Sequence, residues 1–265
     1  MLESSDLNPT MPRVSALHFL SRLGPVLAVV SIMGIYLDPP LSITGSVVAL
    51  LVLGALAGTY YARREFERAA ILGMLFIIFL PGLANWDLAT PAIGAALLLT
   101  ASVIYRPWRS AFALNSSVAV VVSAFAVVLG VVGFQIVNSL RSSSSTSIGW
   151  TELPGQGNIT ATVFFVLIAS AINATFEELL WRFAIPLLFR SSKGMIIQWI
   201  LVSICFGVAH LHGTPGGMLG VLFASIFGFM MCVLRHLSHG SITWVIGVHF
   251  FADVILIGAL YGIFF

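Results

Sequence analysis

Charged residues are scarce in this sequence. Asp, Glu, Lys and Arg make up 8% of the 265 residues, whereas about 25% is usual in a soluble domain. Hydrophobic residues make up 59%, so the composition excludes an ordinary soluble domain and predicts an integral membrane protein that crosses the bilayer several times. Nothing in the composition supports nucleic-acid binding.

Cysteine is scarce as well, and several hydrolase motifs are missing. Cys205 and Cys232 are the only cysteines and lie in apolar segments, so they predict neither a redox compartment nor a metal site. The sequence contains no His-Glu-x-x-His motif, which is typical of soluble zinc proteases. It also lacks the Gly-x-Ser-Gly and Gly-x-Gly-Asp patterns of serine and aspartyl intramembrane proteases.

Long apolar runs, in contrast, are abundant. About 20 mostly apolar residues are needed to span the hydrocarbon layer. The predicted helices cover residues 23–37, 41–61, 69–84, 90–105, 111–139, 159–189, 195–211, 218–234 and 241–264. One of the shorter runs could be a re-entrant segment, so about 8–9 spans are predicted. The predicted fold class is therefore an all-α, polytopic transmembrane helical bundle.

A serine-rich loop divides the predicted helices into two groups. The run from Ser142 to Ser145 lies in the longest loop, and its composition is typical of a flexible linker. The predicted segments are a cytoplasmic tail (1–22), N-terminal transmembrane helices (23–139), the linker (140–158) and a C-terminal four-helix core (159–265).

The positive charges alternate between the two sets of loops. Ten of the 12 Lys and Arg residues fall in alternate loops, and only Arg141 falls in the opposite set. By the positive-inside rule, this pattern places the N-terminus in the cytoplasm. The membrane would be the plasma membrane if the chain is prokaryotic.

Small residues spaced four apart predict places where two helices approach closely. They are Gly54 with Gly58, and Gly220 with Ala224 and Gly228. These glycines are interpreted as packing residues without a chemical role.

Three charged residues interrupt one of the apolar segments. An ionisable residue within the bilayer costs about 2.5 to 3.5 kcal/mol on the insertion scale, so it indicates a functional site. On a helix Glu178 and Arg182 stand four apart and are expected to form an ion pair. Glu177 points about 100° away and is left free. The alternative is that these charges lie near a helix end and reach out to the lipid headgroups.

Other polar residues of the last helices are expected at a similar depth. A helix rises about 1.5 Å per residue, which places Glu177 and Asp253 each about 18 Å from the cytoplasmic helix ends. His210 lies about 22 Å and His249 about 12 Å from those ends. Either histidine alone could simply form a hydrogen bond with a neighbouring helix. Together with the acids they predict one polar site inside the bilayer.

These residues carry a resemblance to a known family. The three motifs are Glu177-Glu178-x-x-x-Arg182, Phe206-x-x-x-His210 and His249-x-x-x-Asp253. In order and spacing they resemble the motifs of the CAAX protease and bacteriocin-processing family of intramembrane endopeptidases. This family is also called CPBP or Abi and includes the type II CAAX prenyl endopeptidases. The resemblance covers about residues 159–265.

The resemblance implies an intramembrane protease. In such a protease Glu177 would be the base that activates water, and Glu178 and Arg182 would set the charge and orientation of Glu177. His210 and His249 would position the water or stabilise the oxyanion. A carboxylate within reach of a water molecule is a suitable general base, and preorganised donors supply a large share of catalysis.

Asp253 departs from the commonest pattern, because many family members have Asn there. An amide can donate a hydrogen bond to an oxyanion, whereas an ionised carboxylate can only accept one. Either Asp253 is protonated, or it orients His249, or a cation is present. A Zn²⁺ ion could be held by the oxygen and nitrogen ligands of Glu177, His210, His249 and Asp253. We favour the metal-free mechanism, so no cofactor is firmly implied.

Two other classes of function remain open from the sequence. Buried acids and histidines also occur in proton-coupled transporters, although no internal repeat of the kind common in transporters is found here. A catalytically silent membrane scaffold or immunity protein is the other alternative. The expected partners are the lipid bilayer and a peptide or protein substrate with a membrane-associated tail, such as a prenylated CAAX tail, a bacteriocin precursor or a sorting tail. The sequence does not predict an oligomeric state.

Overall fold

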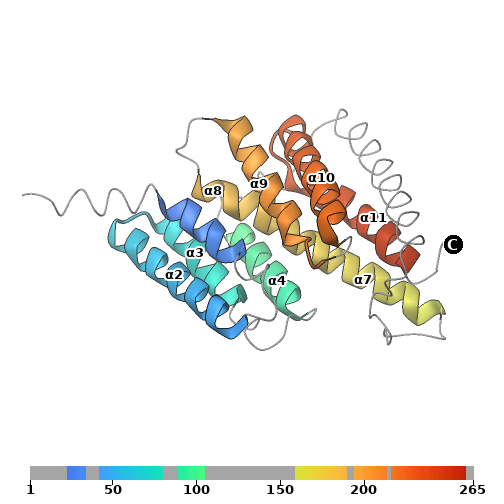
Figure 1. Cartoon of the computed structure of the whole chain (residues 1–265), viewed down its shortest axis with the longest axis horizontal. Helices are drawn as coiled ribbons and strands as arrows, with labels where there is room; N and C mark the ends of the chain where they lie inside the picture. The colour runs from blue at the N-terminus through green and yellow to red at the C-terminus, as the bar shows by residue number, and fades with distance from the viewer. Residues whose placement is uncertain are drawn as a thin grey trace, which may run out of the picture.

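The protein is described by a computed structural model that covers residues 23–33, 42–79, 89–104, 159–189, 194–213 and 216–260. Within these ranges all regular secondary structure is helical (Figure 1). This confirms the all-α part of the predicted fold class. The predicted tail at 1–22, the predicted span at 111–139 and the linker at 140–158 lie outside the described residues.

The helices follow the apolar runs of the sequence closely. The first is Leu23–Met33. The labelled helices are α2 (Ser42–Ala62), α3 (Phe66–Phe79), α4 (Ala89–Ile104), α7 (Ile159–Glu178), α8 (Ile185–Leu188), α9 (Met195–Ala209), α10 (Gly217–Leu237) and α11 (Ile242–Leu260). A π-helical segment, η3 (Leu179–Ala184), joins α7 to α8 without a break in the helix.

Two of the described helices are long and apolar enough to cross a membrane. They are Ile159–Leu188 and Gly217–Leu237. The shorter apolar helices are Leu23–Met33, Val47–Ala62, Pro91–Ala101, Met195–Ala209 and Ile242–Gly258. The count of eight or nine spans therefore stays a prediction, while the apolar helices fit a membrane protein.

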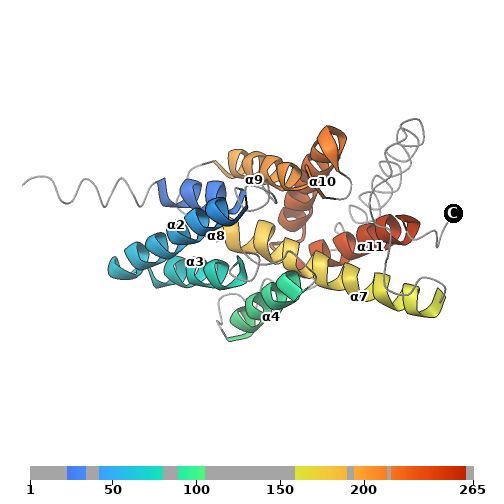
Figure 2. The same cartoon turned by 60° about the horizontal axis from the view of Figure 1, so that its bottom comes forward.

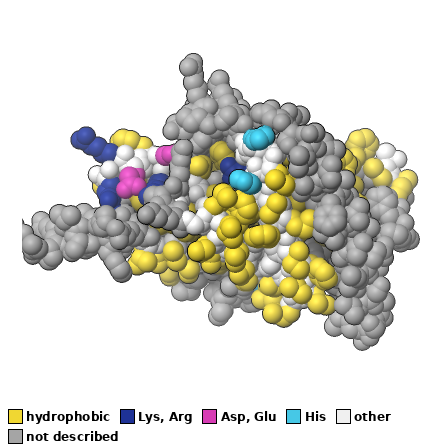
Figure 3. Space-filling model, turned by 90° about the horizontal axis from the view of Figure 1, so that it is seen from above, with side chains coloured by type: hydrophobic (Ala, Val, Ile, Leu, Met, Phe, Trp, Pro, Cys, Tyr) yellow, Lys and Arg dark blue, Asp and Glu magenta, His cyan; other side chains and the backbone are white. Residues whose placement is uncertain are grey.

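The outer faces of these helices are apolar. Phe164 on α7, Ile197 on α9 and Met218 on α10 are each more than half exposed. On the face shown in Figure 3, hydrophobic side chains cover much of the described surface, and the acidic side chains gather at one end. Exposed apolar surface of this extent is what a surface that faces lipid requires.

Helix α7 is the central element of the described fold. It packs against α4 on one side and against α11 on the other, while α9 pairs with α10 and α2 with α3 (Figures 1 and 2). One cluster of buried hydrophobic side chains runs from Ala28 in the first helix to Val248 in α11. The first four described helices therefore share a core with the C-terminal ones.

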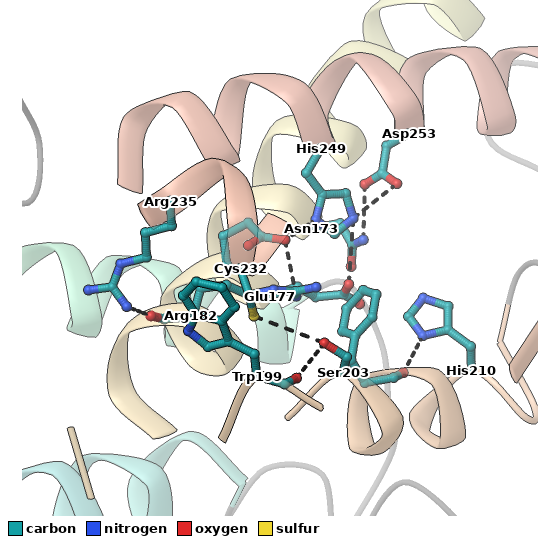
Figure 4. Close-up of polar contacts among 12 residues, drawn as sticks. Asn173, Glu177, Arg182, Trp199, Ser203, His210, Cys232, Arg235, His249 and Asp253 are labelled. Carbon is teal, nitrogen blue, oxygen red and sulfur yellow. Dashed lines mark hydrogen bonds and ion pairs between the residues drawn. The ribbon is translucent and has the colours of Figure 1, made fainter. Parts of the chain in front are cut away.

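The π-helical segment has an identifiable cause and partner. Pro186 has no backbone N–H, so the carbonyl of Arg182, four residues earlier, receives no helical hydrogen bond from it. Arg235, near the end of α10, donates from Nη1 to this carbonyl (Figure 4). Ile185 instead bonds to the carbonyl of Leu180, five residues back. Such π segments in α-helices are frequent at functional sites.

Glycines allow α9 and α10 to approach closely. The glycines observed at this contact are only partly those that the sequence indicated. A Cβ on Gly228 would lie 3.0 Å from the Arg182 guanidinium and 3.1 Å from the Phe206 ring, which confirms a packing role for Gly228. A Cβ on Gly207 would overlap the hydroxyl of Ser225, and the sequence gave no sign of this contact. A Cβ on Gly58 would meet no described atom within 4 Å, so the packing role of Gly58 stays a prediction.

Candidate active site

His249 on α11 lies among three carboxyl groups. Its Nδ1 is 2.6 Å from Oε1 of Glu178. Its Nε2 is 3.6 Å from Oε2 of Glu177 and 3.5 Å from Oδ1 of Asp253. Since an ionised carboxylate only accepts hydrogen bonds, Nδ1–H donates to Glu178. This bond fixes the ring so that Nε2 faces Glu177 and Asp253 (Figure 4).

Glu178 is buried inside the protein and contacts two partners. Its side chain is fully buried, and Oε1 lies 3.2 Å from Nη1 of Arg182 as well as close to His249. The ion pair between Glu178 and Arg182 that the four-residue spacing predicted is therefore present. The contact with His249 is an addition from a helix 71 residues further along the chain.

Arg182 is buried, and its charge is balanced by neighbouring groups. Its side chain is 0% exposed, and burying a cation is tolerated only when a counterion or an equivalent partner lies near. Glu178 supplies the counterion. The guanidinium carbon also lies 4.1 Å from the centre of the Phe206 ring, a cation–π geometry.

Glu177 differs from its neighbour Glu178 in both access and pairing. Its side chain is 12% exposed, whereas that of Glu178 is 0% exposed. Among the described side chains no group forms a hydrogen bond with Oε2 of Glu177, although this atom is buried. The sequence predicted that one acid is paired locally and the other left free. Glu178 is paired with Arg182, and Glu177 has a longer contact, of 3.6 Å, with Nε2 of His249.

Asp253 is held from both sides. One turn along α11 from His249, its Oδ1 lies 3.5 Å from Nε2 of that ring. Its Oδ2 accepts a hydrogen bond of 3.0 Å from Nδ2 of Asn173 on α7 (Figure 4). Asp253 therefore connects α7 to α11 next to His249.

Asn173 is the site residue that the sequence reasoning missed. The signal available was its place four residues before Glu177, on the same face of an apolar helix. Its partner Asp253 is 80 residues away, and no local pattern indicates so distant a contact.

His210 lies beside this group and outside its hydrogen-bond network. It follows the last residue of α9, and its Nδ1 lies 2.8 Å from the carbonyl oxygen of Phe206, to which it donates. The two rings are 4.6 Å apart, and His210 is within electrostatic reach of Glu177. In the described part of the chain no hydrogen bond or ion pair joins His210 to the other five predicted site residues.

Phe206 is the apolar contact that these groups have in common. Its ring centre is 4.6 Å from that of His210 and 6.0 Å from that of His249, and the Arg182 guanidinium lies over it. Figure 4 shows His210 to one side of the cluster formed by His249, Asp253 and Glu177. The structure therefore brings five of the six predicted residues into one network and places the sixth next to it.

The side chains do not form a preformed metal site. A structural or catalytic Zn²⁺ needs three or four protein ligands in tetrahedral positions. In the ranges that the structure describes, no group of three or more His, Cys, Asp or Glu residues is arranged to hold a metal ion. The Nδ1 atoms of His210 and His249 are engaged by Phe206 and Glu178, which leaves Nε2 as the nitrogen of each ring that could bind a metal. The Zn²⁺ ligand set suggested from the sequence stays a prediction, and no step is derived through a metal.

Comparison with known proteins gives one family match. Residues 159–255 match the family model described as type II CAAX prenyl endopeptidase Rce1-like. This range includes α7 to α10, most of α11 and all of the residues just described. No curated protein and no solved structure matches the chain.

The fold and the site thus define a class. The described C-terminal helices are a membrane-type bundle that encloses a cluster of acids and imidazole. Residues 159–255 are similar to the type II CAAX prenyl endopeptidase Rce1-like domain, and this similarity supports the CAAX protease (CPBP) family.

Proposed function

We propose that this protein is an intramembrane endopeptidase that hydrolyses a peptide bond by means of a water molecule activated by Glu177. The observation that carries the proposal is the difference between the two adjacent acids. The Glu178 side chain is fully buried, and its Oε1 contacts both Arg182 and His249, whereas the Glu177 side chain is 12% exposed and its ion-pair contact with His249 is longer, at 3.6 Å. A base must reach its water within about 2.6 to 3.2 Å, and of the two adjacent acids only Glu177 has a partly exposed side chain.

The proposed reaction begins with proton transfer from water to Glu177. The hydroxide formed attacks the carbonyl carbon of the scissile peptide bond, and the carbonyl oxygen becomes an oxyanion. The C–N bond then breaks, and Glu177 returns the proton to the leaving amine. The products are a carboxylic acid and an amine, which exchange a proton to become a carboxylate and an ammonium ion, and Glu177 ends ionised as it began.

The other residues position the reacting groups. Glu178 accepts from Nδ1–H of His249 and so directs Nε2 towards Glu177. Arg182 balances the charge of Glu178. His210 donates from Nδ1 to Phe206, which leaves its Nε2 for the substrate or the water. These fixed polar groups supply electrostatic stabilisation without reorganisation during the reaction.

The proposed substrate is a protein or peptide with a membrane-associated tail. The apolar outer faces of α7, α9 and α10 support it, because a substrate that reaches this site must approach through or along the lipid layer. A prenylated CAAX tail, a bacteriocin precursor and a sorting tail all meet this description. We also propose the topology with the N-terminus in the cytoplasm, on the basis of the loop charges.

The experiment compares membrane proteins in cells that express the wild type or the Glu177→Gln variant. We expect new protein N-termini, at sites near or within membrane segments, only with the wild type. Ser170→Ala is the matched control. Ser170 lies on the same helix, is fully buried and has no hydrogen-bond partner among the described residues, so its removal should leave cleavage intact.

The alternatives give different results in this comparison. Cleavage that persists in Glu177→Gln would exclude the proposed mechanism. Substrate-dependent proton flux in liposomes without proteolysis would indicate a transporter. A cellular phenotype that Glu177→Gln rescues as well as the wild type does would indicate a scaffold or immunity protein.

A further inference from the structure

Asn173 and Glu177 occupy the same face of α7, one helical turn apart. Asn173 therefore points towards the helix α11 that carries His249 and Asp253. Its Nδ2 donates to Oδ2 of Asp253 over 3.0 Å. Asn173 makes no other hydrogen bond or ion pair with a described residue, so its one polar contact is within the proposed site.

This hydrogen bond determines how the Asp253 carboxylate is turned. The terminal torsion of an Asp side chain is broad and roughly two-fold, so a carboxylate without a partner rotates easily. Because Asn173 holds Oδ2, the other oxygen, Oδ1, is directed to Nε2 of His249 at 3.5 Å. An amide N–H can only donate, so Asp253 acts as an acceptor in this contact.

His249 is then held at both ring nitrogens. Glu178 accepts from Nδ1–H, and the carboxylate oriented by Asn173 lies opposite Nε2. Nε2 is also the atom that faces Oε2 of Glu177 at 3.6 Å. The position of the His249 ring edge relative to Glu177 thus depends on a chain of contacts that begins at Asn173.

We propose that Asn173 is a positioning residue of the protease site, which holds the Asp253 carboxylate against His249 and so aligns that ring with Glu177. This inference rests on the proposed function and adds to it a residue from outside the three sequence motifs. A merely structural role would be that of an interhelical hydrogen bond. Single bonds of this kind contribute little to the stability of membrane helices, whereas a small misplacement of a catalytic group lowers the rate strongly.

The test uses the full chain in detergent or liposomes, with the membrane protein whose cleavage depends on Glu177 as substrate. For Asn173→Ala we expect kcat to fall about tenfold to hundredfold, with KM and the thermal unfolding midpoint close to those of the wild type. Ser170→Ala, one helical turn earlier on α7, should change none of these quantities. An unchanged kcat in Asn173→Ala would overturn the inference.

An exchange of the two side chains tests the same contact without removing it. Asn173→Asp places two carboxylates against each other and removes the donor, so it should be less active than Asn173→Ala. The double variant Asn173→Asp with Asp253→Asn restores an amide opposite a carboxylate. It should be about tenfold more active than Asn173→Asp alone, because the two positions are energetically coupled. A double variant no more active than Asn173→Asp would contradict the proposal, even if Asn173→Ala did not fold.

The failure of this inference can be told apart from the failure of the proposed function. If cleavage depends on Glu177 but not on Asn173, the protease stands and the positioning role falls. If the wild type and Glu177→Gln give the same protein N-termini, the proposed function falls, and the inference falls with it.

Discussion

Oε1 of Glu178 lies 2.6 Å from Nδ1 of His249. The same oxygen lies 3.2 Å from Nη1 of Arg182. One buried carboxylate oxygen therefore joins η3 to α11. It balances a buried cation and at the same time sets the orientation of the imidazole ring in the proposed site.

Glu178→Gln is expected to destabilise the protein as well as to inactivate it. The substitution leaves the guanidinium of Arg182 buried without a counterion, and breaking a buried ion pair costs about 3 to 5 kcal/mol. Thermal unfolding of the purified protein in detergent measures this. Glu177→Gln is the matched control, and it should unfold close to the wild type because the Glu177 side chain is partly exposed and its contact with His249 is long, at 3.6 Å.

A second substitution separates the two effects of Glu178. Arg182→Met in the Glu178→Gln background removes the unpaired cation, so stability should recover in part while cleavage stays absent. If Glu178→Gln unfolds no earlier than Glu177→Gln, the ion pair does not have the structural role inferred here.

Arg235→Met should lower the stability of the π-helical segment. The carbonyl of Arg182 would lose its donor, and a buried polar group left without a partner costs about 1 to 3 kcal/mol. Pro186→Ala in the same background supplies a backbone N–H four residues after Arg182 and should restore part of the loss. Thermal unfolding of the single and double variants checks this. No rescue by Pro186→Ala would show that Arg235 acts in another way.

Gly207→Ala and Gly247→Ala form a pair with opposite expected outcomes. A Cβ on Gly207 would collide with Ser225 where α9 meets α10, and overpacking of this kind costs about 1 to 3 kcal/mol. A Cβ on Gly247 meets no described atom within 4 Å. Because Gly in a helix is less favourable than Ala by about 0.5 to 1 kcal/mol, Gly247→Ala should be neutral or slightly stabilising. Similar unfolding midpoints for the two variants would contradict the observed α9–α10 contact.

Treatment with a chelator is expected to leave Glu177-dependent cleavage unchanged. The described side chains are not arranged as a group of three or more ligands for a metal ion. Metal analysis after dialysis, together with the cleavage assay, measures this. Stoichiometric zinc that survives dialysis and is lost in His249→Ala would reverse the interpretation.

The helices themselves could be predicted from the sequence because their signal is local. The apolar run predicted at 159–189 is observed as a continuous helix from Ile159 to Leu188, and that at 218–234 as Gly217–Leu237. The predicted pair of Glu178 and Arg182 is local too, because side chains four residues apart share a helix face. The number of spans is a different matter, since it depends on helices that are too short to be judged by length and composition alone.

The contacts between helices could not be predicted in the same way. Depth estimates placed Glu177, His249 and Asp253 near one level, but they say nothing about rotation of the helices around their axes. Rotation decides that Asn173 meets Asp253 and that Phe206 lies between His210 and His249. It also decides that Gly207, which no pattern in the sequence indicated, is the glycine on which α10 packs.

By itself the sequence determined the helical elements, the apolar surface they present and the supply of acids and imidazoles on the last helices, because hydropathy and helical spacing act over a few residues. Only the tertiary structure decided that Glu178 is fully buried while Glu177 is partly exposed, and which side chains orient His249. Those outcomes depend on packing between segments that are 70 to 80 residues apart, where the closest fit of many side chains, rather than any local pattern, determines which atoms meet.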